Sequence, residues 1–232
     1  MSRIAPASKN TAQSIRPARQ KTLSDARRQH VLDSARAVFF ELGLEGTSIR
    51  EIAKHAGYTP GAIYSYFTSK EDVYAALLGE SLERLNEAVR IAVGPATGKP
   101  DQRLAAAAKA FFQFYADNPR DLDLGFYLFQ GMQPRGLTAE LNEQLNKRLR
   151  DSLAPVETAL QELGMTQAMA LAEVTALFAH VVGLLVLSHT GRIRMFRQQS
   201  SDLFAAYLQQ LAARAASHGS EPIRQHGVSP AR

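Results

Sequence analysis

Two short helix-like segments joined at a glycine constrain the fold of this 232-residue chain more than any other feature. In residues 49–56 the apolar side chains recur at the spacing of one helical face, and the segment ends at Gly57. The second segment, residues 60–67, opens with Pro60, which is favoured in the first turn of a helix. Helices of about eight residues are marginal alone, so tertiary packing must hold both. Because glycine permits a sharp turn between them, the pattern predicts a helix-turn-helix.

The outer side of the second segment is small or hydroxyl-bearing and carries no charge. Its residues are Thr59, Gly61, Ala62, Tyr64, Ser65 and Tyr66. Small residues let a helix enter the DNA major groove, and hydroxyls hydrogen-bond phosphates or base edges. The flanking residues Arg50, Lys54 and Lys70 would neutralise phosphates. The alternative for the same residues is a tight helical hairpin whose tyrosines pack in the core.

The net charge of +5 is concentrated at one end of the chain. Residues 1–70 contain 11 of the 27 Lys and Arg residues but only 5 of the 22 Asp and Glu residues. This asymmetry predicts a polyanionic partner for the first third, either nucleic acid or an anionic membrane. The sequence contains no cysteine, which excludes a disulfide scaffold, a thiol nucleophile and a thiolate metal site.

Two helix starts carry the pattern of a capping box, in which a hydroxyl residue is followed three positions later by Glu. They are Ser48 with Glu51, and Thr68 with Glu71. The second of these predicts a long helix that runs to the Gly94-Pro95 break.

The remaining sequence reads as helices separated by glycine and proline. One is predicted to begin at Ser24 and end at Gly43. Others are predicted over residues 101–117, 119–130, 138–163, 166–190 and 200–216. We therefore predict an all-α fold with a flexible basic arm over residues 1–22, a helix-turn-helix domain over 23–70, a larger helical domain over 71–216 and a disordered tail over 217–232.

Several motifs between Ser34 and Leu78 occur together. They are A-x-x-x-F (Ala35, Phe39), G-x-x-x-T (Gly43, Thr47), I-A-x-x-A-G (residues 52–57), G-x-x-Y-x-Y-F (Gly61, Tyr64, Tyr66, Phe67) and S-K-E (residues 69–71). The segment resembles the N-terminal DNA-binding domain of the TetR family of bacterial transcriptional regulators. Val73 stands where Leu is commoner in the family and keeps the apolar contact.

The resemblance implies a role on DNA for each matching position. Thr47 and Ser48 would bind a phosphate at the start of the second helix, and Arg50 would reach a base edge or a phosphate. The positions that would face bases are Thr59, Gly61, Ala62 and Ser65. The positions that would hold the DNA backbone are Tyr64, Tyr66 and Lys70.

The rest of the chain resembles the family less, but it fits the family architecture. That architecture implies an N-terminal three-helix DNA-binding domain within about nine helices, an effector cavity among the central helices, and a homodimer formed by the last two long helices. The penultimate predicted helix carries small residues that permit close helix approach, namely Ala172, Ala176, Ala179 and Gly183. Ordinary core packing explains the same residues, so the dimer prediction depends on the resemblance.

Aromatic residues are concentrated in the region expected to hold the effector. Seven of the 18 aromatics lie within residues 111–129, where they would line a cavity for an apolar ligand. The candidate effector contacts are Phe111, Phe114, Tyr115, Phe126, Tyr127, Phe129, Met132 and His180. The alternative for each aromatic is ordinary burial in the core, and for His180 a satisfied core or interface position.

The sequence therefore predicts a cytoplasmic, ligand-responsive regulator, most simply a repressor, that binds double-stranded operator DNA of pseudo-palindromic sequence and is released by a small molecule. No enzyme, cofactor or metal site is predicted, because the six histidines lack ligand spacing and no phosphate-binding glycine loop or G-x-S-x-G motif occurs. The longest apolar-rich stretch, residues 174–187, falls short of the roughly 18–20 residues that span a bilayer, so no membrane partner is expected.

Two alternatives compete with this prediction. The first is an all-helical small-molecule-binding protein or enzyme whose basic N-terminus merely keeps it soluble. The second is an architectural protein that binds DNA without sequence specificity.

Overall fold

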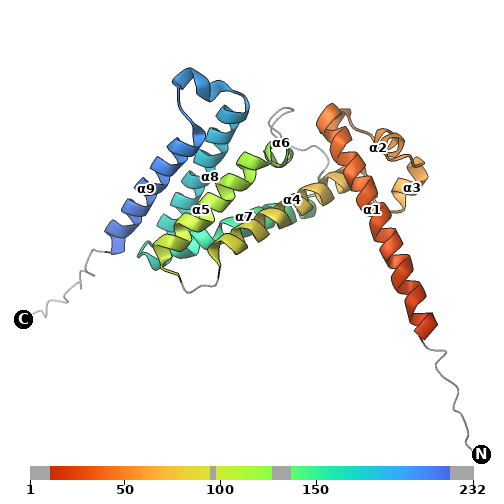
Figure 1. Cartoon of the computed structure of the whole chain (residues 1–232), viewed down its shortest axis with the longest axis horizontal. Coiled ribbons are helices and arrows are strands. Elements are labelled where there is room, and N and C mark those ends of the chain that lie inside the picture. Colours follow the sequence, from red (N-terminus) through yellow and green to blue (C-terminus); the bar gives the residue numbers. More distant parts are fainter. Residues whose placement is uncertain (1–10, 95–97, 127–136, 220–232) are drawn as a thin grey trace, which may run out of the picture. The chain divides into compact units, whose positions relative to one another are not determined.

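The computed structural model describes residues 11–94, 98–126 and 137–219, and within these ranges the chain is helical and contains no strand (Figure 1). The elements are α1 (Thr11–Gly46), α2 (Ile49–Ala56), α3 (Pro60–Tyr64), α4 (Lys70–Val93), α5 (Pro100–Asp117), α6 (Pro119–Phe126), α7 (Ala139–Glu162), α8 (Gln167–His189), the 3₁₀ helix η1 (Arg192–Phe196) and α9 (Ser200–Gly219). The all-α prediction is confirmed. The boundaries of α5, α7 and α8 lie within one residue of those predicted, whereas η1 was not predicted.

The chain divides into two compact units, and the division falls between Leu77 and Leu78. α1, α2, α3 and the first turns of α4 belong to the first unit. The later turns of α4 and the helices from α5 to α9 belong to the second. The predicted boundary after residue 70 therefore falls at the start of α4, seven residues before the division.

The core of the first unit is built on one face of α1. Val31, Leu32 and Ala35 are fully buried there, and α1 packs against α2, which packs against α3. Phe39 meets Tyr74 of α4 edge to face, with ring centroids 6.0 Å apart. The buried apolar residues of the short helices are Ile49, Ile52, Ala53, Ala56 and Ile63. Phe67 is also buried, but it lies after α3, which ends at Tyr64 and not at residue 67 as predicted. The apolar side of α2 thus faces α1, and α3 is held mainly through α2.

The start of α1 differs from the prediction. The helix begins at Thr11 and not after Ser24, so residues 11–22 are helical where a flexible arm was expected. Ser is a common cap but is also tolerated inside a helix, and no Gly or Pro interrupts residues 18–42. Residues 1–10 of the predicted arm lie outside the described part of the chain. Gly43 ends the regular helix as predicted, with φ 69° and ψ 178°.

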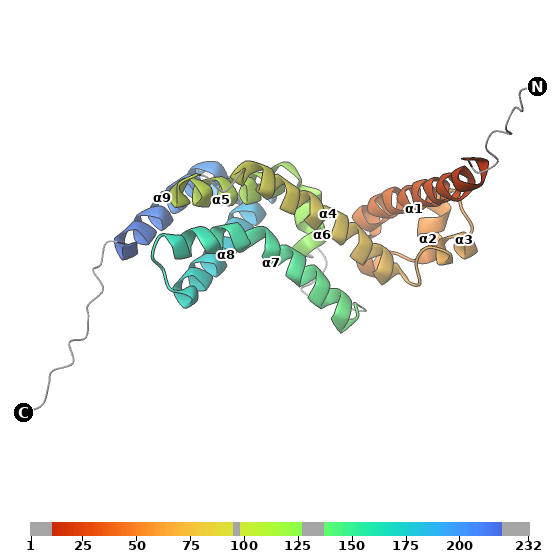
Figure 2. The same ribbon diagram turned by 90° about the horizontal axis from the view of Figure 1, so that it is seen from below.

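The second unit packs its helices around α5, which contacts α6, α7, α8 and α9. Figure 2 shows the same helices from a second side. Leu104, Ala108 and Phe111 of α5 are buried in this core, together with Leu160 of α7 and Leu177 of α8. Ion pairs join the rims of these helices: Arg103 with Glu162, Arg148 with Glu83, and Arg214 with Glu173. α9 extends to Gly219, three residues past its predicted end, and residues 220–232 of the predicted tail lie outside the description.

α8 corrects one expectation about membranes. Of the helices that the structure describes, it is the one that is long and apolar enough to cross a bilayer by length and composition. The apolar stretch 174–187 is shorter than the 23-residue helix that contains it, because residues 168–172 extend the apolar character toward the N-terminus. One-third of its most apolar window is buried, and it packs against α5, α7 and α9.

Candidate nucleic-acid interface and aromatic cluster

The start of α2 places two neighbouring hydroxyl residues in different environments. Ser48 is exposed and caps the helix, since its Oγ accepts a hydrogen bond from the Glu51 N–H at 3.2 Å. Thr47 is buried, and its hydroxyl donates to the carbonyl of Gly43 at 2.5 Å. Lys70 closes the same corner by donating to the carbonyls of Thr47 at 3.1 Å and Glu45 at 3.4 Å. Of these predicted DNA contacts, Ser48 is open to a ligand, while Thr47 and Lys70 use their polar atoms to hold α1, α2 and α4 together.

The turn between α2 and α3 requires glycine. Gly57 has φ 70°, in the left-handed region, where it lets the Tyr58 N–H reach the Ala53 carbonyl at 2.9 Å. His30 of α1 supports the same turn, because its Nε2 lies 3.1 Å from the Ala56 carbonyl. The His30 ring also meets the Tyr58 ring edge to face at 5.6 Å. Sequence reasoning gave His30 no role, since its partners are 26 residues or more away.

α3 is capped by Thr59, whose Oγ1 accepts a hydrogen bond from the Ala62 N–H at 3.3 Å. Ser65 at the other end donates its hydroxyl to the Ala62 carbonyl at 2.7 Å. Ile63 is fully buried and α3 packs against α2, so the opposite side of the helix faces outward. That outward side consists of Thr59, Gly61, Ser65 and Tyr64, all exposed, with Ala62 and Tyr66 half-buried at its edges.

Tyr64 is the most prominent side chain of this surface. It is 57% exposed, and its hydroxyl is free of any polar contact within the described part of the chain. Arg50 and Lys54 of α2 are exposed beside α3 and likewise have no ion pair among the residues described. The alternative of tyrosines packed in the core therefore does not hold for Tyr64. The surface offers hydrogen-bond donors, small residues and positive charge to one partner.

The predicted aromatic cluster forms in the second unit. Tyr115 is its centre, with ring centroids 5.4 Å from Phe111, 5.2 Å from Phe114 and 5.8 Å from Phe126. Phe178 of α8, which the sequence did not single out, joins Phe111 at 6.0 Å and Phe126 at 5.6 Å. Three further predicted contacts, Tyr127, Phe129 and Met132, lie outside the described residues.

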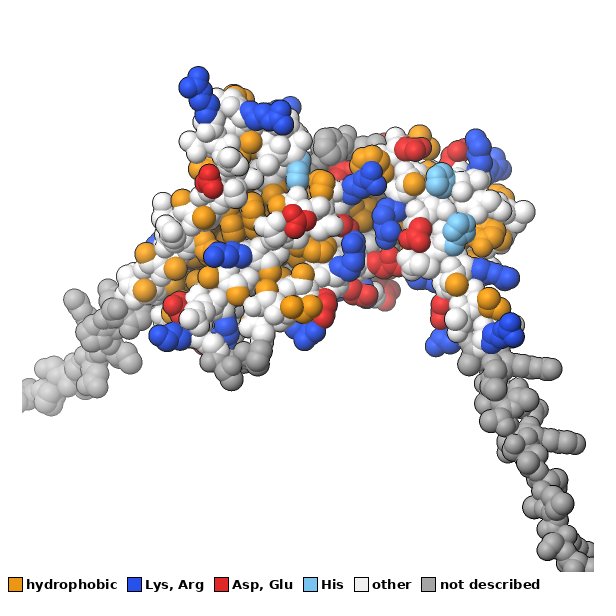
Figure 3. All heavy atoms as spheres, in the orientation of Figure 1, with side chains coloured by type: hydrophobic (Ala, Val, Ile, Leu, Met, Phe, Trp, Pro, Cys, Tyr) orange, Lys and Arg blue, Asp and Glu red, His pale blue; other side chains and the backbone are white. Residues whose placement is uncertain are grey.

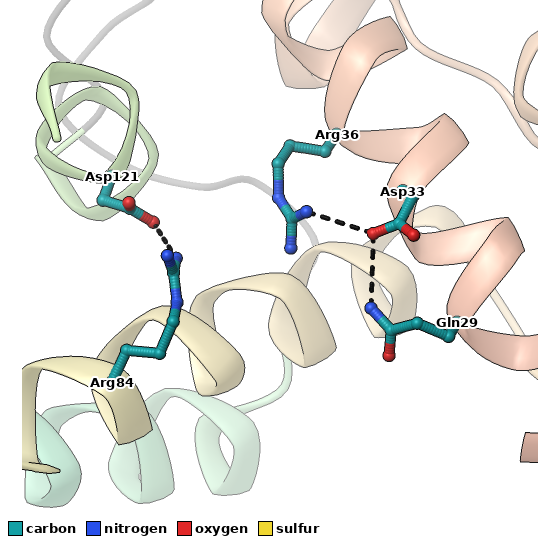
Figure 4. Close-up of polar contacts among 5 residues, drawn as sticks. All are labelled: Gln29, Asp33, Arg36, Arg84 and Asp121. Carbon is teal, nitrogen blue, oxygen red and sulfur yellow. Dashed lines mark hydrogen bonds and ion pairs between the residues drawn. The ribbon is translucent and has the colours of Figure 1, made fainter. Parts of the chain in front are cut away.

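Burial raises the pKa of the Tyr115 hydroxyl, and the negative charge of Asp121 raises it further. Tyr115 therefore stays protonated and can only act as a neutral hydrogen-bonding group. Asp121 is itself held by Arg84 of α4, whose Nη2 lies 2.6 Å from its Oδ1, as Figure 4 shows. The Arg84 guanidinium also lies 5.9 Å from the centroid of Phe114. The cluster is thus connected through one ion pair to α4.

The remaining predicted effector residue, His180, lies away from the cluster. Its ring stacks on Tyr207 of α9 at 4.2 Å, and burial lowers its pKa while a hydrogen bond with the Leu203 backbone opposes that shift. The histidine that meets the cluster is His189, whose Nε2 lies 3.2 Å from the Tyr115 carbonyl oxygen. The two histidines are nine residues apart, which at about 100° per residue places them on opposite sides of α8, so they meet different helices. Among the described residues, no group of His, Asp and Glu is arranged to hold a metal ion.

An apolar surface of small residues lies along α8 and α9. Figure 3 shows hydrophobic side chains gathered over α5, α8 and α9. On α8 the exposed residues include Ala172, Ala176, Ala179 and Gly183, together with Leu171. On α9 they include Ala205, Ala206, Ala213 and Ala216. The predicted small residues of the penultimate helix are therefore exposed and not part of this chain's own core.

Comparisons with known proteins agree with the first unit most closely. Residues 31–77 match the model of the family described as bacterial regulatory proteins, tetR family. The transcriptional activator FasR of Mycolicibacterium smegmatis is 38% identical over 90 residues, which are 39% of this chain and 41% of that protein. The transcriptional repressor AcnR of Corynebacterium diphtheriae is 37% identical over 73 residues, 32% of this chain and 38% of that protein. The aligned segment therefore spans less than half of either relative.

The whole fold also has solved counterparts. The transcriptional regulator FadR from Bacillus subtilis, crystallised in complex with stearoyl-CoA, has a TM-score of 0.61 and is 21% identical, over 80% of this chain and 97% of that chain. At that identity the likeness shows the fold alone. The helix-turn-helix motifs and the match to residues 31–77 show that the first unit is similar to the DNA-binding part of the tetR family of bacterial regulatory proteins, and the second unit shares only its helical fold with the solved counterpart.

Proposed function

We propose that the protein is a homodimeric DNA-binding transcriptional regulator in the cytoplasm, released from a pseudo-palindromic operator by a small, largely apolar effector. The observation that carries the proposal is the outward side of α3, which is polar and uncharged. It is flanked by Arg50 and Lys54, which have no ion pair with any residue in the described part of the chain. Such a surface suits the major groove, where hydroxyls meet base edges and cations meet phosphates.

We further propose a smaller set of direct DNA contacts, which the burial and hydrogen bonds of these residues support. We assign phosphate binding to Ser48, Arg50, Lys54 and Tyr66, at the rim of the surface. We assign base contacts to Thr59, Gly61, Ala62 and Ser65, and a DNA-backbone contact to the exposed Tyr64. Thr47 and Lys70 act through the position of α2 and not as direct contacts, because their polar atoms bind carbonyls of the chain itself.

The exposed small residues of α8 and α9 support the dimer. Exposed Ala residues on both helices, with Gly183 on α8, let two copies of the helix pair approach closely, and burial of this face removes apolar surface from water. A dimer with two-fold symmetry would place two α3 helices about 34 Å apart, one turn of duplex DNA.

The aromatic cluster supports an apolar effector. Its ring faces and the neutral Tyr115 hydroxyl suit an acyl or aromatic group, and the FadR complex makes a long-chain acyl-CoA the first compound to test. α6 carries both Phe126 and Asp121, and Asp121 binds Arg84 of α4. A ligand that displaces α6 would move α4 through this ion pair, and α4 leads directly to the DNA-binding unit. The ligand can then weaken DNA binding by no more than the difference between its affinities for the DNA-bound and the released conformation.

The decisive experiment is gel retardation with the DNA upstream of the protein's own coding region. Sequence-specific retardation that weakens with added salt is expected, and a scrambled duplex at the same salt should bind at least about a thousandfold more weakly. Absence of binding at low salt overturns the proposal in favour of a ligand-binding protein or an enzyme. Equal binding to both duplexes supports an architectural protein instead.

Tyr64→Ala tests the site itself. The variant should weaken operator binding by at least about 1 kcal/mol while its helicity, measured by circular dichroism, stays unchanged. Phe196→Ala is the matched control, since Phe196 is an equally exposed aromatic in the second unit. Unchanged operator affinity for Tyr64→Ala would remove Tyr64 from the site.

The effector proposal is tested by adding stearoyl-CoA or free CoA to the retarded complex. Release by the acylated compound alone is expected, and Phe114→Ala should raise the concentration needed. Asp121→Asn should leave calorimetric binding of the ligand largely intact while reducing release. If stearoyl-CoA neither binds nor releases DNA, the acyl-CoA assignment fails and the DNA-binding proposal stands.

A further inference from the structure

The face of α1 that packs in the core of the first unit can be followed toward the N-terminus of the helix, where its residues become exposed. Between Val31 and Phe39, the residues on this face recur every three or four positions, and they are apolar and buried. The same spacing, continued backward, reaches the polar residues Arg28, Arg27, Ser24 and Lys21. The character of the stripe therefore changes from apolar to basic within one turn.

Arg28 marks where the change occurs. Its guanidinium lies 4.9 Å from the centroid of the Phe67 ring, and Phe67 stands three residues after the end of α3. Lys21 is seven residues earlier on the same face, about 10 Å further along the axis at 1.5 Å per residue. Figures 1 and 2 both show the first turns of α1 extending past α2 and α3. Residues 19–27 are all exposed.

The charge of this segment selects one kind of partner. Residues 19–28 contain Arg19, Lys21, Arg27 and Arg28 but one acid, Asp25. Lys21 and Arg27 have no ion pair with any residue that the structure describes. Leu23 is the single large apolar residue in the segment, which is too little apolar surface for a membrane or a protein core. Phosphates of duplex DNA complement an uncovered basic helix beside α3.

We propose that the basic stripe, defined as Lys21, Arg27 and Arg28, binds the phosphate backbone of the duplex flanking the base pairs that α3 reads. The proposal rests on the proposed DNA-binding function and extends it. Ten ångströms along α1 corresponds to roughly three base pairs at 3.4 Å each, so each half-site is longer than the recognition helix alone requires. These contacts add affinity and no sequence preference, because phosphates are the same at every base pair.

The test measures operator affinity by fluorescence anisotropy over a range of salt concentrations. The variant Lys21→Ala/Arg27→Ala leaves Arg28 on Phe67 and removes two contacts per protomer. Each lost phosphate contact lowers the slope of log affinity against log salt by about 0.9, so a dimer should lose roughly 3 to 4. At about 0.1 M salt the affinity should fall at least about tenfold.

Two controls separate a local contact from a general charge effect. Lys109→Ala/Arg192→Ala removes the same two charges from exposed sites in the second unit, and its slope should equal that of the wild type. Arg19→Ala lies on the same helix but off the stripe, so its effect should be clearly smaller than that of Lys21→Ala. Circular dichroism confirms that each variant keeps its helicity.

Duplex length supplies a second readout. Wild type should bind an operator with five extra base pairs at each end more tightly than one that stops at the bases read by α3, and the Lys21→Ala/Arg27→Ala variant should lose this difference. The proposal is overturned if the variant keeps the wild-type slope, or if the Lys109→Ala/Arg192→Ala control loses as much. Failure of the wild type to bind any duplex would instead overturn the proposed function.

Discussion

α3 and α8 each present an uncovered side, and the two sides have opposite chemistry. α3 spans five residues, buries Ile63 completely and presents Thr59, Gly61, Tyr64 and Ser65 outward. α8 spans 23 residues and carries apolar residues on its buried side and also on its exposed side, where Leu171 is 42% exposed. The difference indicates two different partners. A polar surface with neighbouring cations suits a polyanion, whereas an apolar surface of small residues suits a second helix pair.

The largest expected effect comes from placing charge on the outer side of α8. Ala176→Glu/Ala179→Glu should raise the dimer dissociation constant by at least about a hundredfold, because two-fold symmetry brings the like charges of both copies together and the interface must desolvate them. Sedimentation equilibrium measures the change, and operator binding should fall with it. Ala139→Glu, an exposed site at the start of α7, should remain dimeric. A double variant that stays dimeric would place the interface elsewhere.

We next expect the buried side of α3 to stabilise the first unit and the buried side of α8 to stabilise the second. Ile63 and Leu177 are both fully buried, so each change to Ala should cost about 2 to 4 kcal/mol locally. Hydrogen exchange should show faster exchange over residues 47–67 in Ile63→Ala and over α8 in Leu177→Ala. Equal loss of protection throughout the chain in both variants would show that the units unfold as one.

Gly57→Ala should cost about 1 kcal/mol in unfolding by urea, since φ 70° is unfavourable for a residue with a Cβ and no atom lies within 4 Å to be displaced. Gly61 is a contrasting glycine within α3, where a Cβ would stand 4.0 Å from Thr59 Oγ1. Gly61→Ala should therefore keep or raise stability but weaken operator binding, because its methyl group projects from the DNA-facing side. Lower stability and unchanged DNA affinity in Gly61→Ala would contradict the assigned orientation of α3.

The smallest effect concerns pH in the second unit. Burial lowers the pKa of His180 from its ordinary value of 6.5, so the unfolded chain takes up this proton at a higher pH than the folded chain does. The contribution of neutral His180 is complete above pH 6.5 and declines as pH falls from there through the lowered folded-state pKa. The thermal midpoint should therefore drop less between pH 7.5 and 5.5 in His180→Gln than in the wild type. Parallel drops in both proteins would exclude His180 as a source of the pH dependence.

Local sequence patterns predicted the helix-turn-helix well and its edges less well. Ser48 caps α2 and Gly57 ends it, as expected. The start of α4 is one residue later than predicted, because Ser69 Oγ accepts from the Asp72 N–H at 3.1 Å and the Asp72 carboxylate accepts from the Thr68 N–H at 3.1 Å. Thr68 with Glu71 and Ser69 with Asp72 both satisfy the capping pattern, so the choice between them depends on packing, which buries Val73 and Tyr74.

By itself the sequence determined the helical period, the glycine turn and the position of the basic residues, because these depend on neighbours within about four residues. Tertiary packing decided which of the adjacent hydroxyls, Thr47 or Ser48, stays open to a ligand. It also joined Phe178 to the aromatic cluster and selected His189 over His180 as the neighbour of Tyr115. These outcomes depend on residues far apart in the chain, whose proximity is set by how whole helices pack and not by any local pattern.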